Sequence, residues 1–344
     1  MAEEKGYTIP SNLTAKEFGK VNVVPSGKEL EIDFTILMEP QGKESEGWQT
    51  GVALDGSSSM RNWYGQTLEG NIPPYVIDEY RKKGWIQDQV TDGGPVIGIK
   101  QDAYNDAVQK EYLHYSKNIV EPLAREFISY LAGNLDADGG TTVIYWACAG
   151  GDEIEVLGDF TEEQCLTLDI KGPKTVGSHT ILKPAVNYFV DRFTDASRAM
   201  YIFITDGRID DLGDVKTYTI QLARDISAGK RNPVKCILIG VGDYIDEGQM
   251  IELDNLDTGT DVDIWDHKIA KEMRVLVEIF SEVVSENQIV APTGQIFDSN
   301  GSLLKRFSDG LPAKVSFNMP VSSKYFELEV AGQRIRQEIV KGER

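Results

Sequence analysis

Three oxygen-bearing side chains, Asp55, Ser57 and Ser59, follow directly on the apolar run Val52-Ala-Leu. Where an apolar strand stops at a carboxylate and two hydroxyls, all three oxygen ligands lie on one turn. Hard divalent cations bind oxygen, and Mg²⁺ takes six oxygen ligands in near-octahedral geometry while keeping some as water. The spacing therefore indicates a metal site, and a serine-rich loop without a ligand is the ordinary alternative.

Two later segments strengthen the metal interpretation. The apolar run 199–204 is followed by Thr205, Asp206 and a glycine, so a second buried strand is expected to stop at an acid. Thr180 follows Gly177 in a loop just before another apolar-periodic segment. In an open parallel sheet, ligands collect at the carboxyl ends of the strands, where these side chains would converge.

In this order and context, Asp55-x-Ser57-x-Ser59, Thr180 and Asp206 resemble the metal-ion-dependent adhesion site of von Willebrand factor A domains. The resemblance implies that both serine hydroxyls bind Mg²⁺ directly, with Mn²⁺ or Ca²⁺ as alternatives. It implies that the two aspartates act directly or through water, and that Thr180 alternates between direct and water-bridged contact. An open coordination position would then accept an Asp or Glu carboxylate from a partner protein or from a neighbouring copy of the chain.

The elements that must hold these residues follow from periodicity. Between residues 46 and 286, strand and helix signals alternate, which predicts a doubly wound, mostly parallel α/β sheet, as the resemblance also implies. Strands are predicted at 50–54, 142–147, 200–205 and 234–241, and helices at 119–131, 185–193, 215–226 and 269–284. The apolar stripes of these helices are expected to pack in the core.

The two ends of the chain differ from the middle. Residues 29–38 alternate apolar and polar side chains, which is typical of a half-buried antiparallel strand. After residue 287, short alternating segments return, with a hairpin signal at Asn300-Gly301 and a strand signal over 324–332. We therefore expect residues 1–45 and 287–344 to form one small β-sandwich into which the domain 46–286 is inserted.

Residues 61–101 form a long insertion between the serine turn and the first predicted helix. Connections of this length are usually functional or disordered, and the aromatic content argues against disorder. Because the insertion leaves from the metal loop, Trp63, Tyr64 and Trp85 are predicted to contact a partner. The alternative is a decoration that packs on the domain edge.

Composition limits the class of protein. The chain has 344 residues and a net charge of −20. That field disfavours nucleic acid and anionic lipid and attracts divalent cations and basic protein surfaces, although acidity also simply favours solubility. The first residues show no basic region followed by an apolar run, and no membrane span is evident. With three cysteines and no disulfide pattern, a reducing, cytoplasmic location is expected.

Enzyme chemistry finds little support. A serine hydrolase elbow would need glycine where Met60 stands, and the three histidines (His114, His179 and His267) give no evident base. Gly240-Val-Gly242 lacks the third glycine of a dinucleotide fingerprint. Asp136-Ala-Asp138-Gly139 lacks the remaining ligands of a calcium loop. We therefore expect a binding protein without catalytic residues.

A softer resemblance concerns the subfamily. The segments 134–139, 253–257 and 262–265 are similar to those of copine-like and tellurium-resistance-type A domains, and 262–265 is predicted to be the final strand of the sheet. This similarity implies a link to stress or toxic-metal resistance. The rival hypothesis is a homo-oligomeric assembly protein, built through the sandwich and the insertion, in which the metal loop is structural or vestigial.

Overall fold

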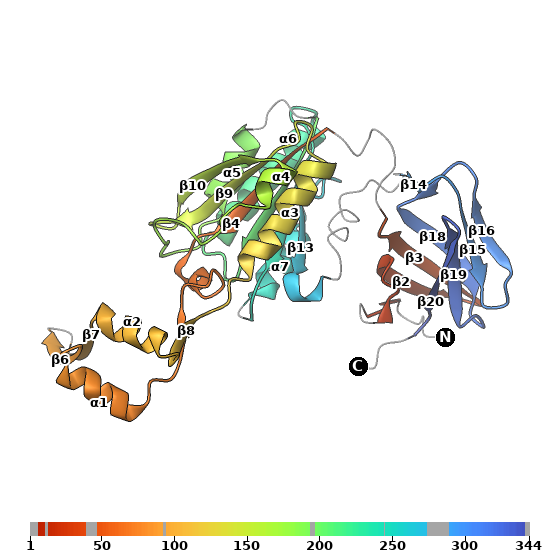
Figure 1. The fold of residues 1–344 in the computed structure, drawn as a ribbon. Coiled ribbons are helices and arrows are strands. Elements are labelled where there is room, and N and C mark those ends of the chain that lie inside the picture. Colours follow the sequence, from red (N-terminus) through yellow and green to blue (C-terminus); the bar gives the residue numbers. More distant parts are fainter. Residues whose placement is uncertain are drawn as a thin grey trace.

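The computed structural model describes residues 6–10, 13–38, 47–91, 94–192, 197–243, 245–273 and 289–340. A central α/β domain carries a β-sandwich on one side and a small insertion subdomain on the other (Figure 1). The boundaries predicted at 45/46 and 286/287 lie outside the described residues and stay predictions.

The central domain is built on one six-stranded sheet with the order β10-β9-β4-β11-β12-β13. All neighbours pair in parallel except β10, which runs antiparallel to β9 at one edge. The doubly wound, mostly parallel sheet expected from the sequence is thus confirmed. The strands are β4 (Trp48–Asp55), β9 (Thr141–Cys148), β10 (Glu153–Phe160), β11 (Arg198–Thr205), β12 (Val234–Gly240) and β13 (Trp265–Ile269).

Helices cover both faces of this sheet because its strands are apolar on both sides. Val52 and Leu54 belong to a core that includes the apolar side of α3, whereas Ala53, between them, belongs to the core under the other helices. The helices are α3 (Val120–Asn134), with the short α4 (Glu162–Cys165) beside it, and, on the opposite face, α5 (Lys183–Arg192), α6 (Leu212–Ser227) and α7 (Glu247–Asp254).

The strand order places a topological switch point next to β4. From β4 the chain passes through α3 to β9 on one side, and it later returns through α5 to β11 on the other side. Ligand sites of open α/β sheets lie where the connections diverge in this way. The carboxyl ends of β4 and β11 are therefore the place where a site is expected.

The insertion is a folded subdomain with a core of its own, and it extends beyond the predicted end at residue 101. Val76, Tyr80 and Leu113 belong to a separate apolar cluster. A pairing of its first and last strands closes the subdomain against the α/β domain. Its elements are β5 (Leu68–Gly70), α1 (Pro74–Lys82), β6 (Ile86–Thr91), β7 (Gly94–Ile99), α2 (Gln101–Gln109) and β8 (Leu113–Tyr115).

The two ends of the chain do build antiparallel sheets together. β3 (Glu29–Ile36) pairs with β18 (Lys314–Pro320), so strands far apart in the sequence share one sheet with β1 (Tyr7–Thr8) and β2 (Phe18–Ser26). Phe326 of the second sheet stacks on Phe18 at 5.7 Å between ring centroids, which seals the two sheets face to face. That second sheet contains β15 (Gly294–Asp298), β16 (Leu303–Phe307), β19 (Tyr325–Val330) and β20 (Gln333–Glu338), and β14 (Ile289–Ala291) pairs with β17 (Leu311–Pro312).

Three predicted details can be compared with these elements. The hairpin at Asn300-Gly301 connects β15 and β16, and Gly301 takes the positive φ of 78° that such a turn needs. The last strand of the central sheet begins at Trp265, later than the strand predicted from 262. Most of the predicted helix 269–284 lies outside the described residues, and its first residues form the end of β13 and a short 3₁₀ turn.

In the described residues, no helix is both long enough and apolar enough to cross a membrane. All three cysteines of the chain are buried, and none of them forms a disulfide. The cytoplasmic location stays a prediction.

Candidate metal centre

Asp55 and Asp206 are brought together by the register of two neighbouring parallel strands. Leu54 of β4 lies opposite Ile204 of β11. The next residues of the two strands, Asp55 and Thr205, therefore lie side by side, and Asp206 directly follows Thr205. The Thr205 hydroxyl donates a hydrogen bond of 2.6 Å to Asp55 Oδ2. Thr205 is thus part of the centre, and the sequence contains no signal that separates it from an ordinary strand threonine.

The two serines line the turn that leaves β4. Ser57 N donates to Asp55 Oδ1 at 2.7 Å, which folds the turn back over the carboxylate. The hydroxyls of Ser57 and Ser59 lie 3.1 Å apart, and Ser59 Oγ donates to Asp206 Oδ1 at 2.7 Å. Asp55 and Ser57 are buried whereas Ser59 is exposed, so the oxygen cluster opens to solvent on the side of Ser59.

Thr180 comes from the loop that runs beside this turn. Gly177 pairs with the turn through backbone hydrogen bonds to Gly56 and Ser58, each of 2.9 Å. A Cβ on Gly177 would lie 1.7 Å from the Ala147 carbonyl oxygen, so only glycine permits this approach. Thr180 is buried, and its backbone N–H donates to Asp210 Oδ2 at 2.9 Å. The loop is therefore anchored at the same end of the sheet as the two aspartates.

Trp63 contacts the centre directly, and the sequence alone does not predict this contact. Its indole N–H donates to Asp206 Oδ2 at 2.7 Å, so Oδ1 and Oδ2 of this carboxylate have different partners. The ring packs against Gly242, which has a φ of 85° and whose absent Cβ would lie 2.4 Å from Trp63 Cζ2. Gly242, just after β12, thus makes room for an indole.

The other two aromatics predicted to contact a partner point into the protein. Tyr64 is buried, and its hydroxyl donates to the Asp55 carbonyl oxygen at 2.8 Å. Tyr64 therefore supports the end of β4 from the interior of the protein and does not lie on the surface. Trp85 is half-buried and packs on Tyr80 at 5.4 Å in the core of the insertion. Periodicity does not reveal these orientations, because the segment after Ser59 has no regular period.

Both carboxylates of the centre, Asp55 and Asp206, are buried, and no positively charged side chain in the described residues neutralises them. Burial raises the pKa of Asp55 to about 6, against hydrogen bonds from Thr205 and Ser57 that lower it, and Asp206 adds repulsion. Burial likewise raises the pKa of Asp206. Within the described residues, no lysine or arginine pairs with either carboxylate. Buried charges are ordinarily paired or bound to a metal, so this pair of carboxylates is suited to binding a cation.

The oxygen spacing agrees with such a cation. Ligands at 2.0–2.1 Å from Mg²⁺ in octahedral geometry lie about 3 Å apart when they are neighbours. The two distances from Ser59 Oγ, 3.1 Å to Ser57 Oγ and 2.7 Å to Asp206 Oδ1, are close to this edge length. Among the described residues, no group of three or more His, Cys, Asp or Glu gathers as a metal site, because this centre draws three of its five oxygen groups from hydroxyls.

No family model and no curated protein matches this sequence. Several solved structures show a distant likeness to it, including the following two. The PilB minor pilin from Streptococcus sanguinis has 10% identity and a TM-score of 0.34, with 81% of this chain and 76% of that chain covered. Three N-terminal domains of the type V pili tip protein Mfa5 from Porphyromonas gingivalis have 9% identity and a TM-score of 0.31, with 97% and 77% covered. Because both TM-scores are low, the function of this chain is inferred from its own side chains.

The remaining candidate groups take structural or solvent-exposed positions. Asp136 Oδ2 accepts hydrogen bonds from Thr50, and its Oδ1 accepts from Asp138 N, so the supposed calcium loop holds the start of β4. His179 is exposed and contacts Ser178 and the Gly150 carbonyl oxygen.

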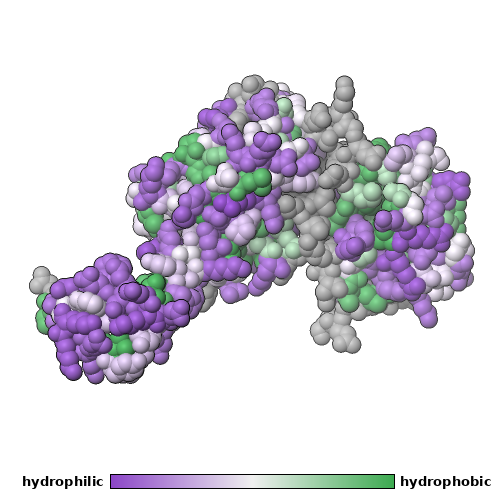
Figure 2. Space-filling view, in the orientation of Figure 1, coloured by the Kyte–Doolittle hydropathy of each residue, from purple (hydrophilic) through white to green (hydrophobic). Residues whose placement is uncertain are grey.

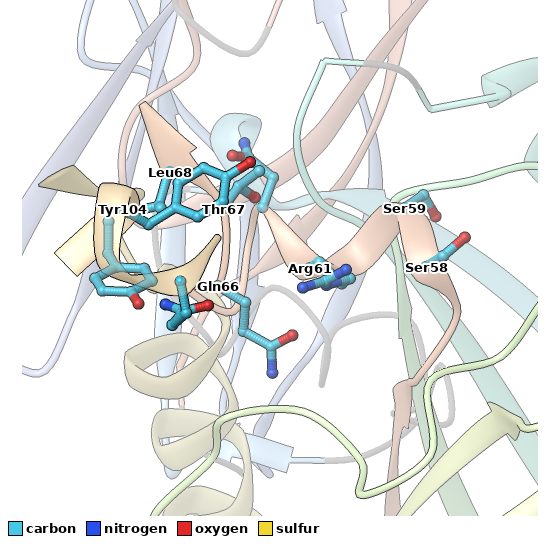
Figure 3. A pocket seen from close by; sticks show the side chains of 10 residues that line it. Ser58, Ser59, Arg61, Gln66, Thr67, Leu68 and Tyr104 are labelled. Carbon is cyan, nitrogen blue, oxygen red and sulfur yellow. The ribbon is translucent and has the colours of Figure 1, made fainter. Parts of the chain in front are cut away.

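A groove of about 520 Å³ adjoins the metal centre (Figure 3). The serine turn lines one end, with Ser58 and Ser59, and the start of the insertion, α2 and the end of β8 line the rest. The insertion therefore forms a wall beside the site, as its place in the sequence suggested. This volume lies within the range of pockets that hold small ligands.

Proposed function

We propose that this chain is a cation-dependent protein-binding module that captures a carboxylate of a partner protein. Asp55, Ser57, Ser59, Thr180 and Asp206 hold one divalent cation, Mg²⁺ or a substitute. One observation carries the proposal: two buried carboxylates and two hydroxyls gather at the switch point of the sheet, and no basic residue in the described part of the chain balances them.

The supporting residues fit a binding role better than a catalytic one. Thr205 and Ser57 N each occupy one oxygen of Asp55, and Trp63 occupies one oxygen of Asp206. This arrangement orients the carboxylates and leaves one lone pair of each oxygen for a cation. When bound, the cation supplies an electrophilic position toward solvent, and the likeness of the five ligands to the adhesion site of von Willebrand factor A domains supports the same function.

Calorimetry with Mg²⁺ tests the metal assignment. Wild-type protein is expected to bind one cation, and Asp206→Ala is expected to bind none while keeping its fold. Asp309→Ala, an exposed acid on the sandwich, is the matched control for loss of one negative charge. Unchanged Mg²⁺ affinity in Asp206→Ala would remove the basis of the proposal.

Capture of a partner is tested separately. Copurification from the native cell is carried out with Mg²⁺ and again with a chelator, and the partner is expected only with Mg²⁺. Asp206→Ala should lose the partner because the cation is lost. Trp63→Ala should weaken capture because Asp206 loses its hydrogen-bond donor. Equal capture by all variants under both conditions would contradict the adhesion function.

An assembly role is the second candidate, and one surface favours it. The β6–β7 hairpin leaves Val90, Ile97 and Ile99 exposed at 87%, 60% and 42% of their surface. Figure 2 shows this hydrophobic edge at the outer end of the insertion. Size-exclusion chromatography separates the two functions, because an assembly through this hairpin would form oligomers with or without chelator.

A further inference from the structure

The groove beside the metal centre has an unusual charge for this protein. The chain carries 55 acidic and 35 basic residues. Among the described residues, no acidic side chain lines the groove, and Arg61 is the one charged residue that does. The other lining groups are mainly hydroxyls, amides and phenols, such as those of Gln101, Tyr104 and Tyr115. A ligand here meets hydrogen-bond donors and one positive charge.

Arg61 is available to such a ligand. Its side chain is exposed, and it forms no ion pair within the part of the chain that the structure describes. Figure 3 shows it between the serine turn and Gln66, along the path from the metal centre into the groove. Gln66 itself is held by the Lys171 carbonyl oxygen, so that wall is anchored to the α/β domain. The positive charge of Arg61 therefore lies on the wall of the groove that Gln66 connects to the α/β domain.

We propose that this groove binds an extended acidic segment of the partner protein and that Arg61 pairs with a second carboxylate of that segment. The inference rests on the proposed function, in which the first carboxylate binds the cation. It adds a sequence requirement to the partner: two acids separated by one residue.

The spacing follows from the local geometry. Ser59 and Arg61 are two residues apart on the 3₁₀ turn Ser58–Arg61. Such a turn rises about 2 Å per residue, and the arginine arm adds several more ångströms. In an extended segment, side chains two residues apart lie on one side at about 7 Å from each other. An acid-x-acid sequence therefore gives the second carboxylate a reach of the same order, from the serine turn toward the guanidinium. Tyr115, 57% exposed, offers an aromatic contact to the flanking residues.

Three fluorescein-labelled peptides test the proposal by anisotropy with the full chain and Mg²⁺. They carry Asp-Ser-Glu, Asp-Ser-Gln or Asn-Ser-Gln between identical glycine and serine flanks. The two-acid peptide is expected to bind about fivefold more tightly than the one-acid peptide, which is the range of a partly exposed ion pair. Arg61→Gln should abolish this difference. Arg306→Gln, an exposed arginine on β16, removes the same charge far from the groove and should leave the difference intact.

The outcomes separate the groove inference from the proposed function. If the one-acid peptide binds only with Mg²⁺ and the second acid adds nothing, the groove inference is overturned while the metal-dependent capture stands. The groove inference is likewise overturned if Arg61→Gln keeps the preference for two acids. If all three peptides bind equally, with or without chelator, then both the inference and the proposed function fail. Loss of the preference in about 0.5 M salt supports the ion pair, because salt screens exposed charges.

Discussion

Replacing Asp55 by asparagine should stabilise the protein in the absence of cations. Asparagine has the same shape, accepts the hydrogen bond from Ser57 N and can donate to the Thr205 hydroxyl, so both neighbours keep a partner. What disappears is a buried charge that no basic residue in the described ranges balances. The substitution therefore removes an unfavourable free energy from the cation-free folded state. It also removes the capacity to bind a cation.

The magnitude follows from the pKa of Asp55. Its pKa lies at about 6 in the folded chain against an ordinary 3.8, a difference of about 2 units. At 1.36 kcal/mol per unit, the buried charge lowers the free energy of unfolding at pH 7 by about 3 kcal/mol. For a domain of this size, Asp55→Asn should raise the melting temperature in chelator by about 6 to 12 °C.

The pH dependence has a definite sign. Because the folded state raises the pKa, it binds the proton more tightly than the unfolded state does. The resulting stabilisation is complete below about pH 4 and is lost as the pH rises through about 6. Cation-free wild-type protein should therefore become less stable from pH 4 to pH 7, and Asp55→Asn should lack most of this decline.

Thermal denaturation in chelator and in Mg²⁺ measures all of these effects. Wild-type protein should gain about 2.7 kcal/mol at a Mg²⁺ concentration of about one hundred times its dissociation constant, and Asp55→Asn should gain nothing. The reasoning is refuted if Asp55→Asn melts at or below the wild-type temperature in chelator while Mg²⁺ still stabilises it. That result would mean that Asp55 is a purely structural carboxylate.

Four further predictions concern Trp63, its neighbour Gly242 and the β-sandwich. Trp63→Phe should weaken Mg²⁺ binding about tenfold in calorimetry, because the Asp206 carboxylate loses one charge-assisted hydrogen bond; an unchanged affinity would show that the indole does not orient the carboxylate. Gly242→Ala should weaken Mg²⁺ binding similarly by displacing that ring, and a crystal structure with Trp63 unmoved would contradict the expectation. Phe326→Ala should destabilise the sandwich by about 3 to 5 kcal/mol in urea, and chains cut after residue 286 should aggregate because β3 loses β18; a soluble, equally stable truncation would show that β3 does not need the C-terminal strands.

Several strands and the residues at which they end can be predicted from the amino-acid sequence alone. Alternation in 29–38 predicts β3, and apolar runs that stop at Asp55 and Asp206 predict β4 and β11 with acids at their carboxyl ends. These features are local, since hydrophobic period and the residue that interrupts it lie within one segment. The convergence of the two aspartates and the pairing of the two chain ends followed from general rules of sheet topology.

The directions of side chains in irregular segments depend on tertiary packing and cannot be predicted from the local sequence. Trp63 and Tyr64 share a non-periodic loop, and both turn toward the metal centre, one to Asp206 and the other to the Asp55 carbonyl oxygen. The space for Trp63 comes from Gly242, far away in the sequence, and the role of Thr205 comes from the register between β4 and β11. These contacts depend on packing between distant segments, so no local pattern encodes them.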